Sequence, residues 1–224
     1  MEVDRISLID TVEEVDLFQI KESEKSTNNI SYPLFFPADQ LRVPQFIIDR
    51  GFNKKILRKW GCGLGKGGSL LIPVYNQFAK LVGWIERFPP NREKRYLNHP
   101  FNVFKKSTVL FGYPFIDREK EFICLTEGAL DTIWMNQHGF NSLAILGVSL
   151  SDIQLCLLND MNIREIVLCF DNDNAGVLCT EKIYKSISKY FLVSTISIPQ
   201  GKKDVQDIRD EQELRRVIDS RYLF

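Results

Sequence analysis

The sequence has few of the residues that build zinc sites or disulfide frameworks. Its five cysteines include no CxxC pair, and three of them lie in apolar stretches where a free cysteine behaves as a small hydrophobe. The only histidines, His99 and His138, are too few and too far apart for a zinc cluster. We therefore predict no zinc site in this chain and no disulfide framework. The cysteines are Cys62, Cys124, Cys156, Cys169 and Cys179.

The sequence also lacks any apolar run near the length that crosses a bilayer. Its first residues, MEVDRISLID, are acidic where a signal peptide would be basic. The glycine-rich stretch GCGLGKGGS, residues 61–69, lacks the spacing of a P-loop and precedes a strand pattern, where a P-loop follows one. With 224 residues and 44% hydrophobic content, the chain is long enough for one substantial core or two small ones. We predict a globular, cytoplasmic protein with no membrane partner.

A net charge of zero hides an uneven distribution of charge along the chain. Residues 1–49 carry 4 basic and 10 acidic residues, residues 50–106 carry 13 and 2, and residues 107–224 carry 12 and 17. The middle segment, with a net charge of +11, also contains nine aromatic residues, a composition typical of a nucleic-acid-binding surface. A basic face that is only solvated is the alternative. Trp60 and Trp84 lie among apolar neighbours, so we predict that both belong to the core.

The first 43 residues are predicted to form an acidic arm and a linker. Thr11 and Glu14 have the spacing of a capping box ahead of Val15 and Phe18, which predicts a short amphipathic helix. The polar stretch KESEKSTNNIS, residues 21–31, has no periodicity and is typical of a linker. The helix would dock on its own domain or, alternatively, bind a partner.

The C-terminal half alternates strand and helix patterns. Four apolar runs, FICLT, SLAIL, IVLCF and LVSTISI, alternate with helical patterns that begin near Ala129, Ser151 and Ala175. This βαβαβαβ succession predicts a parallel sheet with helices on its faces. In such sheets the reactive groups collect just beyond the carboxyl ends of the strands.

Acidic residues follow three of these apolar runs. Glu127 ends the first run and Asp131 comes one helical turn later, while Asp171 and Asp173 follow the third run in LCFDNDNAG. Asp204 and Asp207 follow the last run in PQGKKDVQDIRD. Carboxylates brought so close either share a proton or are held ionised by a hard cation such as Mg²⁺ or Mn²⁺. For DND alone, an aspartate-rich turn ahead of a helix capped by Asn174 is the alternative.

Two blocks of this sequence resemble one known family. EGALD, DNDNAG and KKDVQD resemble, in order and spacing, the three signatures of the TOPRIM domain. Residues 70–112 are similar to the basic subdomain of bacterial and phage DnaG-type primases. The lead-in IIDRGFNKKILRKWGCGLG is similar too, so the resemblance spans roughly residues 44–210. Within residues 70–112, the positions that match the family pattern are Pro73, Gly83, Arg87, Arg95, Tyr96, Leu97, Asn98, Phe104, Lys106, Leu110, Phe111 and Gly112.

The resemblance implies an α/β fold in which a mixed α+β basic subdomain, residues 44–118, precedes a TOPRIM catalytic domain, residues 119–210, and a helical tail, residues 211–224. It implies a DNA primase core that makes short RNA primers from NTPs on single-stranded DNA by metal-dependent nucleotidyl transfer. Two or more Mg²⁺ or Mn²⁺ ions would bind Glu127, Asp171, Asp173 and Asp204. Among these, Glu127, Asp171 and Asp173 would be catalytic, with Glu127 as general base or acid or as a metal ligand.

The other residues implied by the resemblance have supporting roles. Asp131 and Asp207 would complete the acidic site. The template or the incoming triphosphate would contact basic and aromatic side chains, although for Lys94 and Lys105 a simple solvated charge remains the alternative. These contacts are Arg87, Lys94, Arg95, Tyr96, Lys105 and Lys106.

The family's zinc-binding and helicase domains have no counterpart in this sequence. We therefore expect a stand-alone core of phage or mobile-element origin, acting in a bacterial or phage-infected cell. A separate zinc-binding, start-site factor or a replicative helicase would be its partner. Two rival functions remain open, a TOPRIM nuclease that cleaves phosphodiesters and a catalytically silent module that binds single strands or a helicase.

Overall fold

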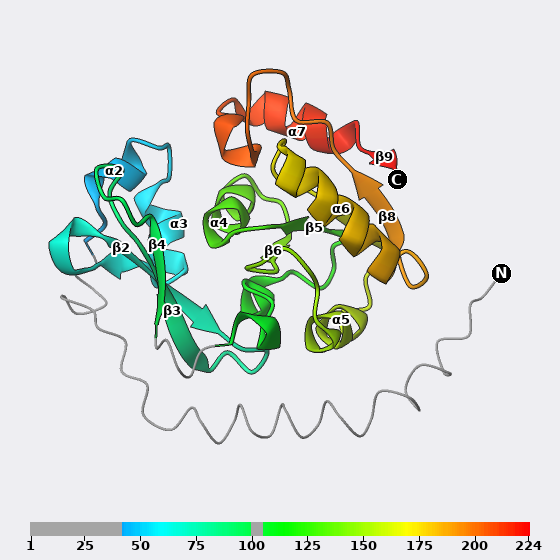
Figure 1. The fold of residues 1–224 in the computed structure, drawn as a ribbon, viewed down its shortest axis with the longest axis horizontal. Coiled ribbons are helices and arrows are strands. Elements are labelled where there is room, and N and C mark those ends of the chain that lie inside the picture. Colours follow the sequence, from blue (N-terminus) through cyan, green and yellow to red (C-terminus); the bar gives the residue numbers. More distant parts are fainter. Residues whose placement is uncertain (1–41, 100–104) are drawn as a thin grey trace.

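The computed structural model describes residues 42–99 and 105–224, which form two sheets with helices packed around them (Figure 1). The helix predicted near Thr11 and the linker predicted at residues 21–31 lie outside the described residues. In the part of the chain that is described, no helix is long and apolar enough to cross a membrane.

The basic unit, residues 42–99, is a small antiparallel sheet preceded by two short helices. Helix α2 (Gln45–Ile48) and helix α3 (Lys54–Lys59) come first, and the Asn53 side chain caps α3 by accepting a hydrogen bond from the Ile56 amide. The sheet has the order β1-β2-β3-β4. A 3₁₀ turn, η3 (Lys66–Gly68), joins its first two strands. The strands are β1 (Gly63–Leu64), β2 (Leu70–Tyr75), β3 (Leu81–Arg87) and β4 (Tyr96–His99).

The second sheet has the order β6-β5-β7-β8-β9 and is parallel except for its last strand. Two 3₁₀ turns, η4 (Lys106–Thr108) and η5 (Tyr113–Phe115), lead into it. Its strands are β5 (Phe122–Thr126), β6 (Ser142–Ala144), β7 (Glu165–Leu168), β8 (Leu192–Thr195) and β9 (Tyr222–Leu223). Its helices are α4 (Ala129–Gln137), α5 (Asp152–Asn159), α6 (Asn174–Ile187), the 3₁₀ turn η6 (Val205–Asp207) and α7 (Glu211–Asp219). The predicted α/β fold class is confirmed.

Both faces of this sheet are covered, as the alternation of side chains along its strands requires. Ile123 and Leu125 of β5 pack with α5 and α6, while Cys124, between them, packs with α4 and α7. Successive side chains of a strand point to opposite faces, so a strand buried on both sides is apolar throughout. This accounts for the unbroken apolar runs of the sequence.

The strand order changes direction between β5 and β7. From β5 the chain crosses over α4 to β6 on one side, and from β7 it crosses over α6 to β8 on the other. In open α/β sheets, the crevice at such a switch point, outside the carboxyl ends of the strands, is where ligands bind. The residues that follow β5, β7 and β8 therefore lie at one edge of the sheet.

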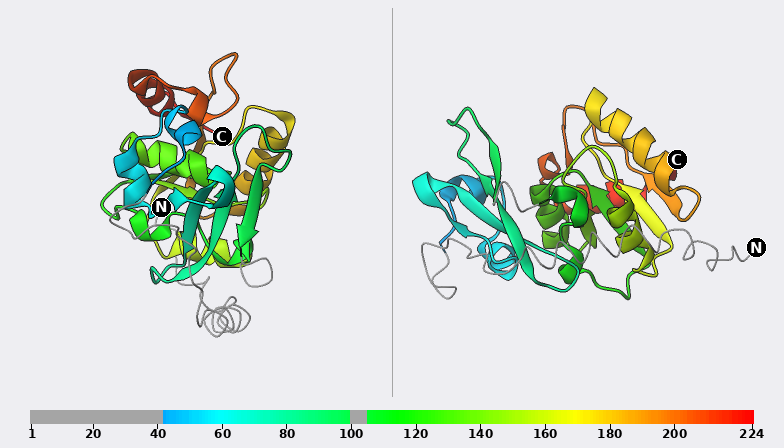
Figure 2. Two further views of the ribbon diagram at one scale, coloured as in Figure 1. Left: turned by 90° about the vertical axis from the view of Figure 1, so that its left-hand side faces the viewer. Right: turned by 60° about the horizontal axis from the view of Figure 1, so that its bottom comes forward.

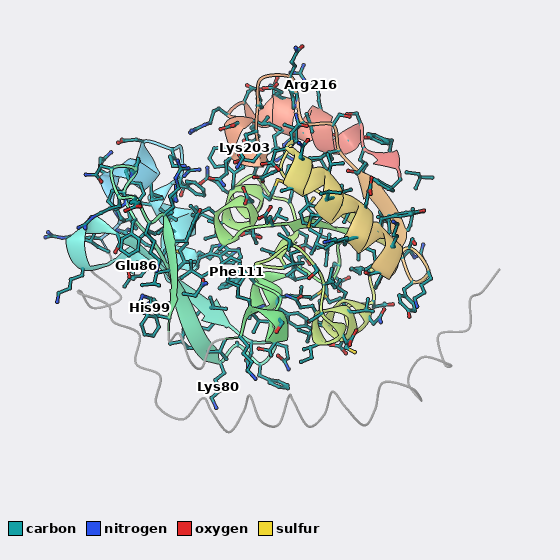
Figure 3. The ribbon with its side chains drawn as sticks, viewed as in Figure 1. Lys80, Glu86, His99, Phe111, Lys203 and Arg216 are labelled. Atoms are coloured by element: carbon teal, nitrogen blue, oxygen red, sulfur yellow. The ribbon has the colours of Figure 1, made fainter. Side chains whose placement is uncertain are left out.

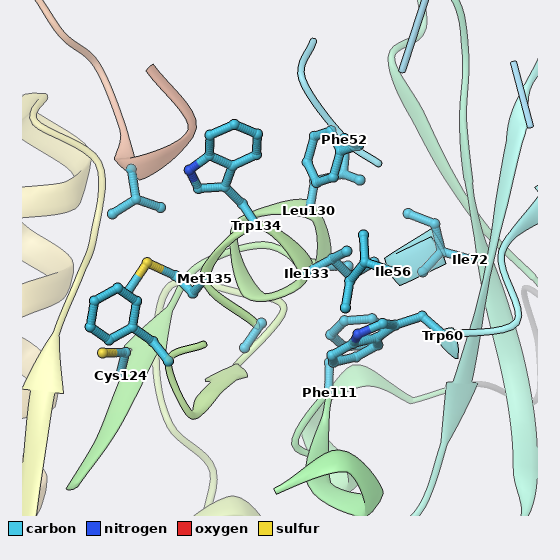
Figure 4. Close-up of a cluster of buried hydrophobic side chains, with 14 of the residues drawn as sticks. Phe52, Ile56, Trp60, Ile72, Phe111, Cys124, Leu130, Ile133, Trp134 and Met135 are labelled. Carbon is cyan, nitrogen blue, oxygen red and sulfur yellow. The ribbon is translucent and has the colours of Figure 1, made fainter. Parts of the chain in front are cut away.

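The two units share one hydrophobic core. Figure 4 shows Phe52, Ile56 and Trp60 of the basic unit facing Leu130, Ile133 and Trp134 of α4. The rings of Phe52 and Trp134 meet edge to face, with centroids 5.3 Å apart, and Trp60 stacks on Phe111 at 5.1 Å. The turned views of Figure 2 show the antiparallel sheet standing beside the α/β unit. Since these side chains are closely packed, the shared core fixes the position of one unit against the other.

Three details of the sequence-based description need correction. Trp60 is in the core as predicted, but Trp84 is only partly buried and stacks on His99 with ring centroids 5.4 Å apart. The predicted helical tail, residues 211–224, is helical only in α7, because β9 pairs with β8 and closes the sheet. Helix α6 is capped by Asp173 and not by Asn174, since the Asp173 carboxylate accepts the Gly176 amide at 2.9 Å.

Candidate active site

The acidic residues predicted from the sequence lie around the switch point. Glu127 comes directly after β5, Asp171 and Asp173 lie in the turn between β7 and α6, and Asp204 precedes η6. Their charges influence one another. Burial raises the pKa of Glu127, and the negative charges of Asp171 and Asp173 raise it further. Burial also raises the pKa of Asp204, with added contributions from Asp207 and Asp171.

The turn that carries Asp171 and Asp173 approaches α6 very closely. A Cβ atom placed on Gly176 would lie 1.9 Å from the Asp171 carbonyl oxygen. Any side chain at this position would clash with the turn, so glycine is required. The final glycine of DNDNAG meets this requirement. One oxygen of Asp173 is occupied in capping α6, and its other oxygen lies 4.0 Å from the Lys203 Nζ.

Lys203 is the cation closest to this pair of aspartates among the described residues. Its Nζ lies 2.8 Å from an Asp171 carboxylate oxygen, and the side chain is 60% exposed. Figure 3 shows Lys203 near the N-terminal end of α6. The Lys203 backbone holds the site as well, because its N–H donates to Asp207 at 2.9 Å and its carbonyl accepts the Asn172 N–H at 2.7 Å.

The Asp204 loop is organised by its own carboxylates. One oxygen of Asp204 accepts the backbone N–H groups of Gln206 at 2.9 Å and Asp207 at 3.1 Å. The exposed Asp207 accepts a hydrogen bond from the Lys203 backbone N–H, so its carboxylate stabilises the loop. Asp131 is only 9% exposed and accepts a hydrogen bond from the Gln206 side chain at 2.5 Å. Burial raises the pKa of Asp131 to about 7.

The donor set suits a hard divalent cation, although it is not drawn together into a closed cage. Across residues 42–99 and 105–224, no three His, Cys, Asp or Glu side chains converge closely enough to hold an ion. The ammonium of Lys203 stands between Asp171 and Asp173, where positive charge is needed. Carboxylate oxygens of this kind are preferred ligands of Mg²⁺ and Mn²⁺. Glu127, Asp171, Asp173 and Asp204 therefore suit the predicted metal by the chemistry of their oxygen donors.

The basic residues predicted to bind nucleic acid divide into buried and exposed members. Arg87 is 6% exposed, donates to the Arg95 carbonyl at 3.3 Å and lies 4.4 Å from the Tyr96 ring centroid. Its Nε is buried without a hydrogen-bond partner among the described residues. The positive charge of Lys106 lowers the pKa of Glu127. The predicted nucleic-acid contacts that are exposed are Lys94, Arg95, Tyr96, Lys105 and Lys106.

The basic unit faces the carboxylates across the shared core. Desolvation raises the pKa of Tyr96, and the carboxylates of Asp131 and Asp204 raise it further. Arg50, which follows α2, donates to the Gln206 side chain at 2.5 Å. A positively charged side with an exposed aromatic ring therefore lies next to the acidic edge of the sheet.

Comparison with known proteins identifies the family. The Toprim-like family model matches residues 124–209. An uncharacterized protein of Mycoplasma pneumoniae is 32% identical over 172 residues, which cover 73% of this chain and 80% of that protein. The DNA primase of Deinococcus radiodurans is 33% identical over 144 residues, covering 60% of this chain and 25% of the primase. This chain belongs to the same family as the Mycoplasma protein, and over part of its length it is similar to DNA primases. It spans about a quarter of the length of the DNA primases that it matches.

Solved DnaG primase structures share the fold of this chain. The structure of the DnaG primase catalytic domain bound to ssDNA superposes with a TM-score of 0.66 at 16% identity, covering 93% of this chain and 79% of that domain. The likeness includes the parallel-rich sheet flanked by helices, as expected for the TOPRIM fold.

Three residues at the site were not among the sequence-based candidates. They are Arg50, Lys203 and Gln206. Arg50 contacts Gln206, Gln206 contacts Asp131, and Lys203 contacts Asp171. Lys203 and Gln206 stand inside the quoted motif KKDVQD, so adjacency to Asp204 was a usable signal. Arg50 lies 156 residues from Gln206 along the chain, and only the fold brings the two together.

Proposed function

We propose that this chain catalyses template-directed synthesis of short RNA primers on single-stranded DNA by nucleotidyl transfer. One observation carries the proposal: Glu127, Asp171, Asp173 and Asp204 lie around the switch point, beside a basic face. The negative charge of Asp171 raises the pKa of both Glu127 and Asp204, so a bound cation would be favourable at this edge. A basic, partly aromatic surface next to them suits a polyanionic template and a triphosphate.

The residues divide the chemistry between them. Asp171, Asp173 and Asp204 would hold Mg²⁺ or Mn²⁺, two ions or more. When bound, such ions supply positive charge that stabilises the attacking and leaving oxygens of the transfer. Glu127, with its raised pKa, would accept the proton of the attacking 3′-hydroxyl. Asp131 and Asp207 would support the acidic edge.

The basic face would position the substrates. Arg95 and Lys106 are exposed and would contact phosphates of the template or of the incoming NTP, with Lys94 and Lys105 adding weaker contacts. Tyr96 is 44% exposed and stacks with Arg87, so it offers a flat surface to a base. A DnaG catalytic domain with this fold binds ssDNA, which supports the same ligand for this chain.

Incorporation of labelled NTPs on single-stranded DNA of mixed sequence, with Mg²⁺ or Mn²⁺, tests the proposal. We expect short products from the unmodified protein that are lost in Glu127→Gln and in Asp171→Ala. Glu181→Gln is the matched control, because Glu181 is exposed on α6 away from the switch point, and it should keep activity. Template shortened without added nucleotides would overturn the proposal in favour of a nuclease. Salt-sensitive DNA binding with no chemistry under any of these conditions would overturn it in favour of a silent binding module.

A further inference from the structure

A pair of short hydrogen bonds joins the basic unit to the acidic edge through one buried side chain. Arg50 Nη2 donates to Gln206 Oε1 at 2.5 Å, and Gln206 Nε2 donates to Asp131 Oδ1 at 2.5 Å. Gln206 is 5% exposed and Asp131 is 9% exposed. A buried amide between a guanidinium and a carboxylate is strongly bound on both sides, because hydrogen bonds to ionised groups are shorter and stronger than neutral ones.

The chemistry of Arg50 fixes the direction of this amide. A guanidinium has donors only, so the Gln206 oxygen must face Arg50 and its NH₂ group must face Asp131. The backbone N–H of the same residue donates to Asp204 at 2.9 Å. Gln206 thus contacts a basic residue and two acidic residues of the proposed site at once.

Simple attachment of the two units does not require Gln206. Gln137 makes a similar double contact, donating to the Gly51 carbonyl at 3.0 Å and accepting the Asn53 N–H at 2.8 Å. Arg209 also donates to the Arg50 carbonyl. These contacts and the shared core already hold the units together, and unlike Gln206, Gln137 has no contact with the carboxylates.

We propose that Gln206 is a positioning residue that aligns Asp131 and the Asp204 loop with Arg50. The acidic edge and the basic face then hold a fixed spacing, as a cation-bound triphosphate that contacts both sides requires. The inference rests on the proposed function for the identity of that ligand. The alignment itself is a property of the protein and is measurable without primer synthesis.

The first test compares Gln206→Met with Gln137→Met, each of which removes two side-chain hydrogen bonds and at least one contact between the units. The probe is Mn²⁺ alone, and the readout is the Mn²⁺-dependent rise in the midpoint of thermal unfolding. We expect the half-saturating Mn²⁺ concentration to increase about tenfold in Gln206→Met, the lower end for loss of a residue that orients metal ligands. It should stay unchanged in Gln137→Met. Equal Mn²⁺ responses in the two variants would overturn the proposal.

The second test exchanges the two side-chain types. Gln206→Glu keeps the acceptor for Arg50 but places a carboxylate against Asp131, so we expect a lower unfolding midpoint. Adding Asp131→Asn supplies an NH₂ donor to the new carboxylate and should restore the midpoint. A double variant no more stable than Gln206→Glu would overturn the proposal, whether or not the unmodified protein responds to Mn²⁺. Absence of primers with rescue intact would instead count against the proposed function alone.

Discussion

Replacing Asp131 by asparagine should stabilise the protein in a strongly pH-dependent way. Burial raises the pKa of this carboxyl from 3.8 to about 7, so the folded protein binds the proton more tightly than the unfolded chain does. Between pH 4 and pH 7 the unfolded chain releases its proton first, and stability falls as the pH rises. Below pH 4 both states hold the proton and the cost disappears.

The shift sets the size of the effect. One pKa unit corresponds to about 1.4 kcal/mol, so a rise of about three units makes ionised Asp131 cost about 4 kcal/mol above pH 7. Asparagine has no proton to lose and its oxygen still accepts the Gln206 NH₂ group. The difference in unfolding free energy between Asp131→Asn and the unmodified protein should therefore grow by about 4 kcal/mol from pH 4 to pH 8.

Urea unfolding at several pH values between 4 and 8 measures this difference directly. Glu127 and Asp204 are present in both proteins, so their own titrations cancel to first order in the comparison. The exposed control Glu181→Gln should give a difference that varies little with pH. A flat difference for Asp131→Asn as well would refute the reasoning, because it would mean that the folded protein does not bind the Asp131 proton tightly.

Three further predictions concern the turn and the basic face. Lys203→Ala removes a half-exposed ion pair worth about 1 kcal/mol, so Mn²⁺ binding, measured by calorimetry, should tighten about fivefold. Gly176→Ala brings a Cβ against the Asp171 carbonyl, which should lower the unfolding free energy in urea by about 1–3 kcal/mol. Lys106→Ala should weaken single-stranded DNA binding and reduce its log–log salt slope by about one, measured by fluorescence anisotropy.

For each of these three variants, one result would contradict the prediction. Weaker Mn²⁺ binding in Lys203→Ala would mean that the lysine does not compete for the cation position. Unchanged stability in Gly176→Ala would mean that the turn yields to the added methyl group. An unchanged salt slope in Lys106→Ala would place its ammonium away from the nucleic-acid phosphates.

The acidic half of the site could be predicted because its geometry follows from local sequence and one rule. Apolar runs predict parallel strands, parallel strands end at one edge, and Glu127, Asp171 and Asp204 each follow such a run. In the alternative interpretation of DND, Asn174 caps the helix that follows, since asparagine and aspartate are both good N-cap residues. The structure shows that α6 begins at Asn174, so the residue before it, Asp173, is the N-cap.

The contacts between the units could not be predicted because they depend on long-range packing. Arg50 reaches Gln206 only after Phe52 and Trp60 pack on α4, and no periodicity in the sequence encodes that approach. The partial exposure of Trp84 has the same origin. A tryptophan among apolar neighbours in sequence is half-buried when its strand has one open face, as β3 has at this position.

Negative charge at the switch point has a cost that the rest of the site is arranged to offset. Glu127, Asp131 and Asp204 all have raised pKa values, so the folded protein loses stability as they ionise. Lys203 offsets part of this repulsion from outside and Gln206 part of it from inside. A bound divalent cation would offset it more fully, because it binds the folded arrangement and not the unfolded chain. The repulsion between carboxylates that weakens this edge is therefore the same interaction that would give it affinity for the divalent cation of the proposed function.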